Sequence, residues 1–389
     1  MKFVLYTNSL SEHQLPLARE IVRRIGDENF RYVYTGESSQ KFQESHAREA
    51  WIRCLKDDPW LEQADVMLVG GIRPIELLAR RAKKGLKTYY MSERWFKPLA
   101  LFDLRLFDCL IPVALPGRVR MWVPRYRRMA KRFVKWANGG PGARVLAIGP
   151  WAKTDFLRLG VSREKIVDWG YFVEKGSGIR DRGSGFGESN NLKSNNQTIL
   201  KILWCGRMLG LKRVETIIRA GGKLKVEKLK GFKVKRFQSF KVTLVGDGPE
   251  KERLIKLAQR LFPGDVAIEQ SNNPNNPNNR TIAFLPSQPM EKVRELMREH
   301  DLFVFPSNGL EGWGAVVSEA LEEGMRVLAS YECGAGAALL PRERLFHSGD
   351  WKTLAQLIEK DVRGELPSCS IGEWTAKAAA TRLLKVAGL

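Results

Sequence analysis

Short apolar runs alternate with stretches of helical periodicity along this chain, and the alternation occurs twice. In the first half the apolar runs lie at residues 3–7, 32–35, 66–70, 86–90 and 145–149, and an amphipathic helix is expected at 15–25. β-Branched and aromatic runs that alternate with helices are typical of a parallel sheet whose strands are joined by crossover helices. The first half is therefore predicted to be a doubly wound α/β domain.

The second half repeats the pattern. Strands are expected at 202–206, 242–246, 282–285 and 301–305, and helices at 213–220, 250–261 and 290–299. A chain of 389 residues with 43% hydrophobic residues is long and apolar enough for two cores. The fold class predicted is therefore α/β, with two Rossmann-like doubly wound parallel-sheet domains facing a cleft.

The domain boundary is expected where the composition turns to Gly, Ser and Asn, which is typical of a flexible linker. We predict an N-terminal domain at 1–174, a linker at 175–198 and a C-terminal domain at 199–372. The helical segment 373–389 is a candidate for packing back on the first domain. The Asn/Pro tract 271–279 is expected to be an inserted surface loop.

Cysteine usage and hydropathy exclude several classes of protein. The five cysteines are scattered without CxxC spacing, which argues against a disulfide framework or a zinc site. The N-terminal apolar run spans only four residues, so it is expected to be a strand and not a signal peptide. No stretch reaches the ~18 apolar residues of a membrane span. We expect a cytoplasmic protein, either soluble or peripheral on the cytoplasmic membrane face.

An anion-binding turn is predicted in PSNGLEGWGAVVSE, residues 306–319. A polar loop containing Ser307 follows the strand, and Gly312, Trp313 and Gly314 open a helix. Glycines let backbone amides approach a ligand closely, and a helix N-terminus attracts anions. This turn is therefore a candidate phosphate cradle.

Two acids flank this turn, Glu311 before the helix and Glu319 inside it. An acid beside a phosphate cradle is electrostatically unfavourable unless it binds hydroxyl groups, which sugars and ribose supply. The alternative is that Glu311 is a solvated loop acid and Glu319 a helix-surface acid.

Two other strand ends carry candidate residues. After the strand at 202–206, Arg207 and Lys212 could converge on one diphosphate, or form an ordinary solvated basic loop. After the strand at 242–246 comes the turn GDGP, which is more often structural and is expected to be a wall of the cleft. The remaining donor-side candidates are Gly206, Gly246, Asp247 and Leu285.

These pieces, in this order, resemble the retaining glycosyltransferases of family 4 over residues 202–330. In that family the glutamate matching Glu311 contacts the transferred sugar, and the one matching Glu319 holds the ribose hydroxyls. The resemblance implies that Arg207 and Lys212 neutralise the donor diphosphate. It further implies that the turn Gly312–Gly314 touches sugar and phosphate.

The N-terminal half is similar to a bacterial branch of the same family through TNSLSEHQLPLA (7–18), TYYMSERWFK (88–97) and DWGYF (168–172). The resemblance places His13 and Gln14 at the acceptor, and Glu93 and Arg94 follow another strand end. His13 could instead cap the first helix, and Glu93 and Arg94 could form a structural ion pair. The family's N-terminal glycine-rich loop is replaced here by Asn8-Ser9-Leu10.

The resemblance implies metal-independent transfer, with retention of configuration, from a UDP- or GDP-sugar to a glycan or lipid-linked acceptor, without any cofactor. Cell-surface polysaccharide or glycoconjugate synthesis would be the role. No acidic metal-binding pair stands at a strand end. A sugar-nucleotide epimerase or a phosphorylase of the same fold is the enzymatic alternative. An NAD-dependent dehydrogenase is disfavoured because no GxGxxG follows the first strand.

A net charge of +22 indicates an anionic partner. Much of this charge falls in residues 117–137 and 223–241. After Pro124 the first segment is an amphipathic helix that could lie on an anionic membrane surface. Alternatively, its apolar side packs on the sheet and its arginines are solvated. Nucleic-acid binding is the rival class, but no recognition-module motif is present, so no specific nucleic acid is expected.

Overall fold

The computed structural model describes residues 1–36, 49–54, 58–95, 117–174, 199–229, 239–268 and 281–388. Within two of its helices, the side chains of 117–123, 125 and 225–229 are not described. The chain forms two compact units, one of residues 1–174 with 373–389 and the other of residues 175–372. The expected linker at 175–198 and the Asn/Pro tract at 271–279 lie outside the described residues.

A seven-stranded sheet forms the centre of the first unit, with strand order β3-β2-β1-β4-β5-β6-β7. All neighbouring strands are parallel, and Leu5 lies between Tyr32 and Leu68 in the register. The strands are β1 (Phe3–Thr7), β2 (Phe30–Tyr34), β3 (Ile52–Cys54), β4 (Val66–Gly70), β5 (Lys87–Ser92), β6 (Ala143–Ile148) and β7 (Ile166–Trp169).

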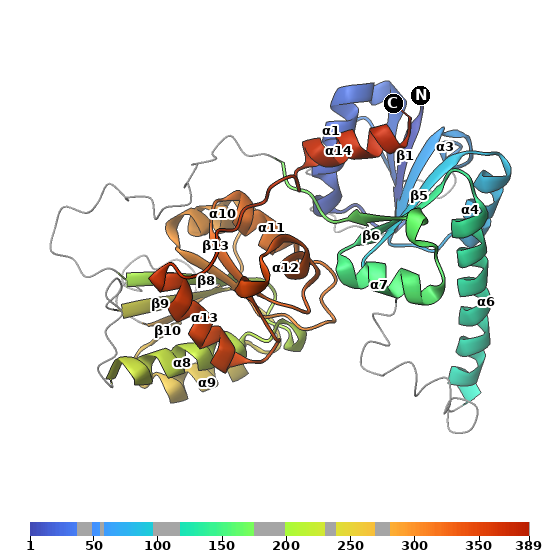
Figure 1. The fold of residues 1–389 in the computed structure, drawn as a ribbon. Helices are drawn as coiled ribbons and strands as arrows, with labels where there is room; N and C mark the ends of the chain where they lie inside the picture. The colour runs from blue at the N-terminus through green and yellow to red at the C-terminus, as the bar shows by residue number, and fades with distance from the viewer. Residues whose placement is uncertain are drawn as a thin grey trace. The chain divides into compact units, whose positions relative to one another are not determined.

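Helices cover both faces of this sheet (Figure 1). Val4 and Tyr6 of β1 belong to a core shared with α3 (Trp60–Gln63), α4 (Ile75–Lys83), α6 (Gly117–Gly139) and α7 (Pro150–Leu159). Phe3 and Leu5 point to the other face because successive strand residues alternate. That face is covered by α1 (Leu15–Ile25), which contacts α14 (Ala376–Val386).

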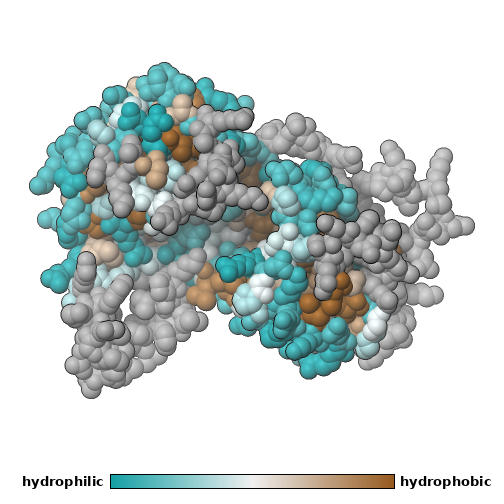
Figure 2. All heavy atoms as spheres, turned by 180° about the vertical axis from the view of Figure 1, so that it is seen from behind, coloured by the Kyte–Doolittle hydropathy of each residue, from teal (hydrophilic) through white to brown (hydrophobic). Residues whose placement is uncertain are grey.

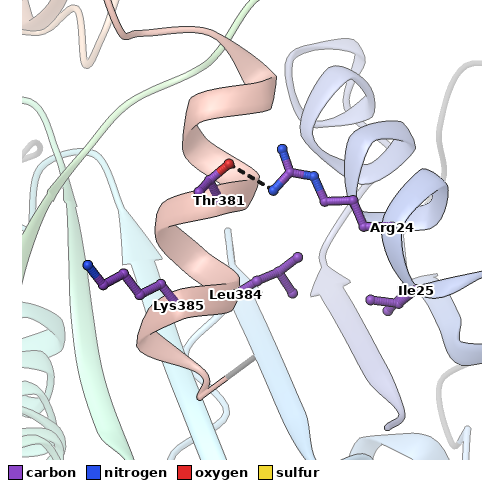
Figure 3. Close-up of a pocket in the computed structure, with 5 residues that line it drawn as sticks. All are labelled: Arg24, Ile25, Thr381, Leu384 and Lys385. Carbon is purple, nitrogen blue, oxygen red and sulfur yellow. Dashed lines mark hydrogen bonds between the residues drawn. The ribbon is translucent and has the colours of Figure 1, made fainter.

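The C-terminal helix α14 belongs to the first unit and is tied to α1 (Figure 3). Arg24 donates hydrogen bonds to Thr381 Oγ1 and to the carbonyl of Lys377, both at 2.8 Å. Arg24, Ile25, Thr381, Leu384 and Lys385 line a pocket of about 430 Å³ between the two helices. Helix α1 runs back from the carboxyl end of β1, so this pocket lies at the opposite edge of the sheet from the strand ends where α/β proteins bind ligands.

The second unit repeats the architecture with strand order β10-β11-β9-β8-β12-β13-β14, again entirely parallel. One group of packed helices comprises α8 (Glu215–Leu229), α9 (Lys251–Leu261) and α13 (Trp351–Arg363), and a second comprises α10 (Met290–Glu299), α11 (Ala315–Glu322) and α12 (Gly334–Leu339). The strands are β8 (Ile199–Cys205), β9 (Ser239–Val245), β10 (Val266–Ile268), β11 (Ile282–Leu285), β12 (Leu302–Phe305), β13 (Arg326–Ser330) and β14 (Leu345–Phe346). The predicted fold class of two doubly wound parallel sheets is confirmed.

Candidate functional site

The second sheet changes winding direction between β8 and β12. From β8 the chain proceeds to β9 on one side, and it later returns to the other side of β8 through β12, β13 and β14. Open parallel sheets bind ligands outside the carboxyl ends of their strands at such a switch point, because the connecting loops diverge there. The loops at 206–214 and 306–314, which follow β8 and β12, therefore frame the expected binding position.

The loop after β8 presents an arginine. Gly206 has a φ of +149°, a conformation that side-chain-bearing residues rarely adopt. The next residue, Arg207, is exposed, and its guanidinium forms no hydrogen bond or ion pair with the described residues. A guanidinium without a carboxylate partner can bind a phosphate through two parallel hydrogen bonds.

Lys212 ends a short 3-10 turn (Gly210–Lys212) in the same loop. Its ammonium forms an ion pair with the carboxylate of Glu311, and each of the two side chains is 16% exposed. The ammonium also lies 5.1 Å from the centre of the Phe305 ring. The predicted cation and the predicted sugar-binding acid are therefore direct partners of each other.

Asn308 holds these two loops together. Its amide donates to the carbonyl of Leu211 at 2.8 Å, and its own side-chain and backbone oxygens accept from Leu310 and Glu311, each at 3.0 Å. An Asn-Gly pair is typical of a turn, so the turn at Asn308 could be predicted from the sequence. Its contact with the loop after β8 could not.

Ser307 is fully buried at the end of β12. Its carbonyl accepts a hydrogen bond from Ser330 Oγ at the end of the neighbouring strand β13. Its hydroxyl has no hydrogen-bond partner in the described part of the chain.

Trp313 and its flanking glycines form the packed base of the turn. The indole of Trp313 donates to Ser318 Oγ at 3.1 Å, and its carbonyl accepts from Cys333 Sγ at 3.0 Å. Gly314 has a φ of +86°, and a Cβ there would lie 2.6 Å from the Phe305 ring. The turn is buried as far as Gly314, and Ala315, at the start of α11, is partly exposed.

Glu319 is not on the helix surface, because it is only 8% exposed. Burial raises the pKa of the Cys205 thiol at the end of β8, and the charge of Glu319 raises it further. Burial likewise raises the pKa of Cys333 to about 12, with a further upward contribution from Glu311 and a downward one from Lys212. The two glutamates and Lys212 therefore act on one small region around the ends of β8 and β12.

The loop after β9 packs backbone against backbone on the loop after β8. A Cβ on Gly246 would lie 1.9 Å from the carbonyl oxygen of Gly206. Asp247 accepts from the Ser287 amide at 2.8 Å and pairs with Lys251, and the Lys251 hydrogen bond is the main cause of its lowered pKa. The carbonyl of Leu285 accepts from the Gly246 amide at 3.0 Å. These three residues support the loops through turn geometry.

In the first unit the equivalent switch point lies between β1 and β4. His13, after β1, stacks on Tyr171, after β7, with ring centres 5.4 Å apart. The Tyr171 hydroxyl donates to Glu93 Oε1, after β5, at 3.1 Å. Three strand-end segments thus meet at one edge of this sheet. Tyr171 was not singled out from the sequence, although it lies in the quoted motif DWGYF.

The other two acceptor-side candidates are placed differently. Gln14 is buried, at 6% exposure. The guanidinium of Arg94 lies 3.4 Å from the carboxylate of Asp155, which is 1% exposed. An arginine held by a buried acid supports the loop after β5.

The apolar side of helix α6 packs in the core of the first unit. Phe133 and Ala137 are fully buried and Trp136 is 6% exposed, whereas Arg127, Arg128 and other basic side chains face solvent. Most of the second basic segment, 223–241, lies outside the described side chains. The described surface in Figure 2 is mostly hydrophilic, with a few hydrophobic patches.

The described residues include no helix that is both long and apolar enough to cross a membrane. Within the same residues, no group of three or more His, Cys, Asp or Glu side chains could hold a metal ion.

Comparisons with known proteins agree with this fold. Residues 188–370, just under half of the chain, match the family described as Glycosyl transferases group 1. No curated protein matches by sequence.

Several solved structures share the fold. HepE of Anabaena, solved in complex with UDP, has 15% identity and a TM-score of 0.60, with 100% of this chain and 98% of that chain covered. The lipopolysaccharide outer core galactosyltransferase WaaB has 12% identity and a TM-score of 0.64, with 100% of this chain and 100% of that chain covered. A glycosyltransferase from Rickettsia africae has 14% identity and a TM-score of 0.59, covering 99% of this chain and 97% of that chain. Residues 188–370 therefore carry a Glycosyl transferases group 1 domain, within a chain that has the two-sheet fold of these glycosyltransferases.

Proposed function

We propose that this protein is a retaining, metal-independent, family 4-like glycosyltransferase that moves a sugar from a UDP- or GDP-sugar to a glycan or lipid-linked acceptor. The observation that carries the proposal is the set of side chains at the β8–β12 switch point. There an exposed Arg207 without a partner among the described residues stands in the same loop as the Lys212–Glu311 pair, and Glu319 is buried in the adjoining helix.

This chemistry fits the departure of a nucleoside diphosphate. Negative charge grows on the diphosphate as its bond to the sugar breaks, so cations that interact more strongly with that charge lower the barrier. Arg207 and Lys212 supply such cations from one loop. Glu311 is proposed to bind the transferred sugar and Glu319 the ribose hydroxyls.

The known proteins support the choice of donor and stereochemistry. HepE of Anabaena has been solved in complex with UDP-glucose. The trehalose-6-phosphate synthase that shares this fold, at 11% identity and a TM-score of 0.57 over 100% of this chain and 95% of that chain, was studied for glycosyl transfer with retention. Front-face attack within an ion pair is the route we propose.

We place acceptor binding on the first unit, at the carboxyl edge of its sheet. His13, Tyr171 and Glu93 supply an aromatic surface and a carboxylate there, Gln14 follows His13 in the same short helix, and Arg94 supports the loop after β5. WaaB, together with WaaG, which is involved in lipopolysaccharide biosynthesis, suggests a glycan or lipid-linked acceptor and a role in cell-surface polysaccharide or glycoconjugate synthesis.

Residues 117–137 and 223–241 are proposed to bring the enzyme to the cytoplasmic membrane face by charge. The apolar side of α6 is already used in the core, so the attraction would depend on its exposed arginines and lysines. Flotation with anionic liposomes at low and high salt tests this. Salt-sensitive co-flotation is expected, and absence from the lipid fraction at low salt would contradict it.

The proposed activity is tested by transfer of labelled sugar from UDP-glucose or a GDP-sugar to a bacterial membrane extract. The variants Glu311→Gln, Glu319→Ala and Lys212→Ala are each expected to lower the rate by at least ~10²-fold, the loss seen when one charge-stabilising group is removed. Glu295→Gln is the matched control, because Glu295 lies half-exposed on α10, where it pairs with Lys292. If all three variants transferred as fast as the control, the assigned site would be wrong.

A further inference from the structure

We propose that the Lys212–Glu311 ion pair is a partner-exchange device that makes the donor site prefer an intact nucleotide sugar over the nucleoside diphosphate left after transfer. The inference rests on the proposed donor site and assigns it a source of specificity. It starts from one contact: the cation expected to hold the diphosphate is already bound to the acid expected to hold the sugar.

The pair is built into the two loops. Lys212 and Glu311 come from opposite sides of the switch point, and the hydrogen bond from the Asn308 amide to the Leu211 carbonyl, at 2.8 Å, fixes the loops one residue from Lys212. Both side chains are only 16% exposed. Water therefore screens the pair weakly, and an incoming anion must compete with the Glu311 carboxylate for the ammonium.

A diphosphate that takes Lys212 leaves Glu311 with two unfavourable features. The carboxylate loses its cation while it remains mostly buried, and it then stands beside a second negative group. A nucleoside diphosphate offers this carboxylate no compensating donor at its terminal phosphate. A sugar attached to that phosphate offers hydroxyl groups that can donate hydrogen bonds to the carboxylate.

Lys212 itself keeps a second partner throughout the exchange. Its ammonium lies 5.1 Å from the centre of the Phe305 ring, within the range of a cation–π interaction. Phe305 is fully buried at the end of β12, and its ring lies 2.6 Å from the position that a Cβ on Gly314 would take. The ring can thus hold the ammonium at the switch point while its anionic partner changes.

The exchange has a direction. With the intact donor, the diphosphate takes Lys212 and the sugar takes Glu311, so both charges remain paired. After transfer the sugar has left, and Glu311 returns to Lys212 in competition with the nucleoside diphosphate. The nucleoside diphosphate is therefore held weakly after transfer, because Glu311 competes with it for Lys212.

Calorimetric titration of the full-length protein with UDP and with UDP-glucose tests the exchange. In Glu311→Gln the Kd for UDP is expected to fall about five- to tenfold, because the competing carboxylate is gone; tenfold corresponds to about 1.4 kcal/mol. The Kd for UDP-glucose is expected to fall less or to rise, so the preference for the sugar-bearing ligand shrinks. Glu295→Gln changes the net charge equally and should leave both Kd values within about twofold of wild type.

A double-mutant cycle with Lys212→Met isolates the pair. In the Lys212→Met background, Glu311→Gln should no longer tighten UDP binding. The exchange is overturned if Glu311→Gln leaves the UDP affinity unchanged or weaker, or if the gain persists without Lys212. Either result, obtained with wild-type protein that binds UDP-glucose, would leave the proposed function standing. Failure of the wild-type protein to bind either ligand would overturn both.

Discussion

Substitution of Gly246 by alanine tests how closely the loops of the second unit must pack. Gly246 has a φ of +137°, and its added Cβ would lie 1.9 Å from the carbonyl oxygen of Gly206. Ordinary contact begins at 3.4 Å, so the two backbones would have to separate by about 1.5 Å. The loop that carries Arg207 would move with them.

Two costs add in this variant. Placing a side chain in the positive-φ region costs about 1–2 kcal/mol. Forcing packed backbone apart costs a further 1–3 kcal/mol or so. We expect Gly246→Ala to lower the free energy of unfolding by about 2–5 kcal/mol.

Gly264→Ala is the matched control, because Gly264 has a φ of +67° but a Cβ there meets nothing within 4 Å. Gly264→Ala is destabilised by the backbone conformation alone. The free energies of unfolding of the two variants, measured with urea, should therefore differ by about 1–3 kcal/mol. In thermal unfolding a difference of 2 kcal/mol would appear as roughly 4–8 °C. Donor affinity should fall in Gly246→Ala and stay unchanged in Gly264→Ala. Equal destabilisation in the two variants would refute the close approach of the loops.

Three other outcomes are expected. Arg213 is the described non-glycine residue with positive φ (50°), so Arg213→Gly should raise the free energy of unfolding by roughly 0.5–1 kcal/mol. Arg213→Ala is the control in urea unfolding, because alanine keeps the backbone strain. Equal stability of the two variants would contradict this. Burial lowers the pKa of the His300 side chain below its usual 6.5, so the contribution of this residue to the stability of the folded state is present above about pH 6.5 and is lost as the pH falls. The free energy of unfolding, measured across pH 5–8 or so, should therefore depend less on pH in His300→Gln than in wild type. Parallel curves would count against this. Tyr171→Phe keeps the stack on His13 but loses the hydrogen bond to Glu93. The KM for the acceptor should rise several-fold, while the Kd for the donor, measured calorimetrically, should stay the same. A changed donor Kd with an unchanged acceptor KM would reverse the assignment.

Elements with strong apolar patterns could be predicted to the residue. The predicted bounds of β1, β4, β11, α1 and α10 match the observed ones, because fully buried strands and amphipathic helices have clear periodicity. No strand was predicted at β3, β7, β10, β13 or β14. β3, β10 and β14 carry almost no pattern because each is only two or three residues long and stands at the edge of its sheet. The basic helix α6 was predicted, but the sequence could not decide whether its apolar side meets a membrane or packs on the sheet, because that depends on tertiary packing. The structure places the apolar side in the core.

The candidate site could be predicted as a set of residues but not as a set of contacts. Strand ends, glycines and charged residues stand out along the sequence. The pairing of Lys212 with Glu311 joins residues 99 positions apart, and nothing in either segment selects that partner. Tyr171 was overlooked because an aromatic after a strand usually packs in a core. Its stack on His13 depends on strand order, which the sequence pattern leaves open.

The central claim is that the loops after β8 and β12 bind the diphosphate of a sugar donor. Titration of UDP-, GDP-, ADP- and CMP-sugars tests it most directly, with unfolding temperature as a second readout because a bound ligand stabilises the folded state. Arg207→Ala should weaken binding at least ~10-fold. Arg260→Ala is the control, since Arg260 is also exposed but lies in the last turn of α9, at the opposite edge of the sheet. A UDP- or GDP-sugar is expected to bind wild type and Arg260→Ala alike, and to bind Arg207→Ala at least ~10-fold more weakly. Binding of no nucleotide sugar, or equal binding by all three proteins, would contradict it.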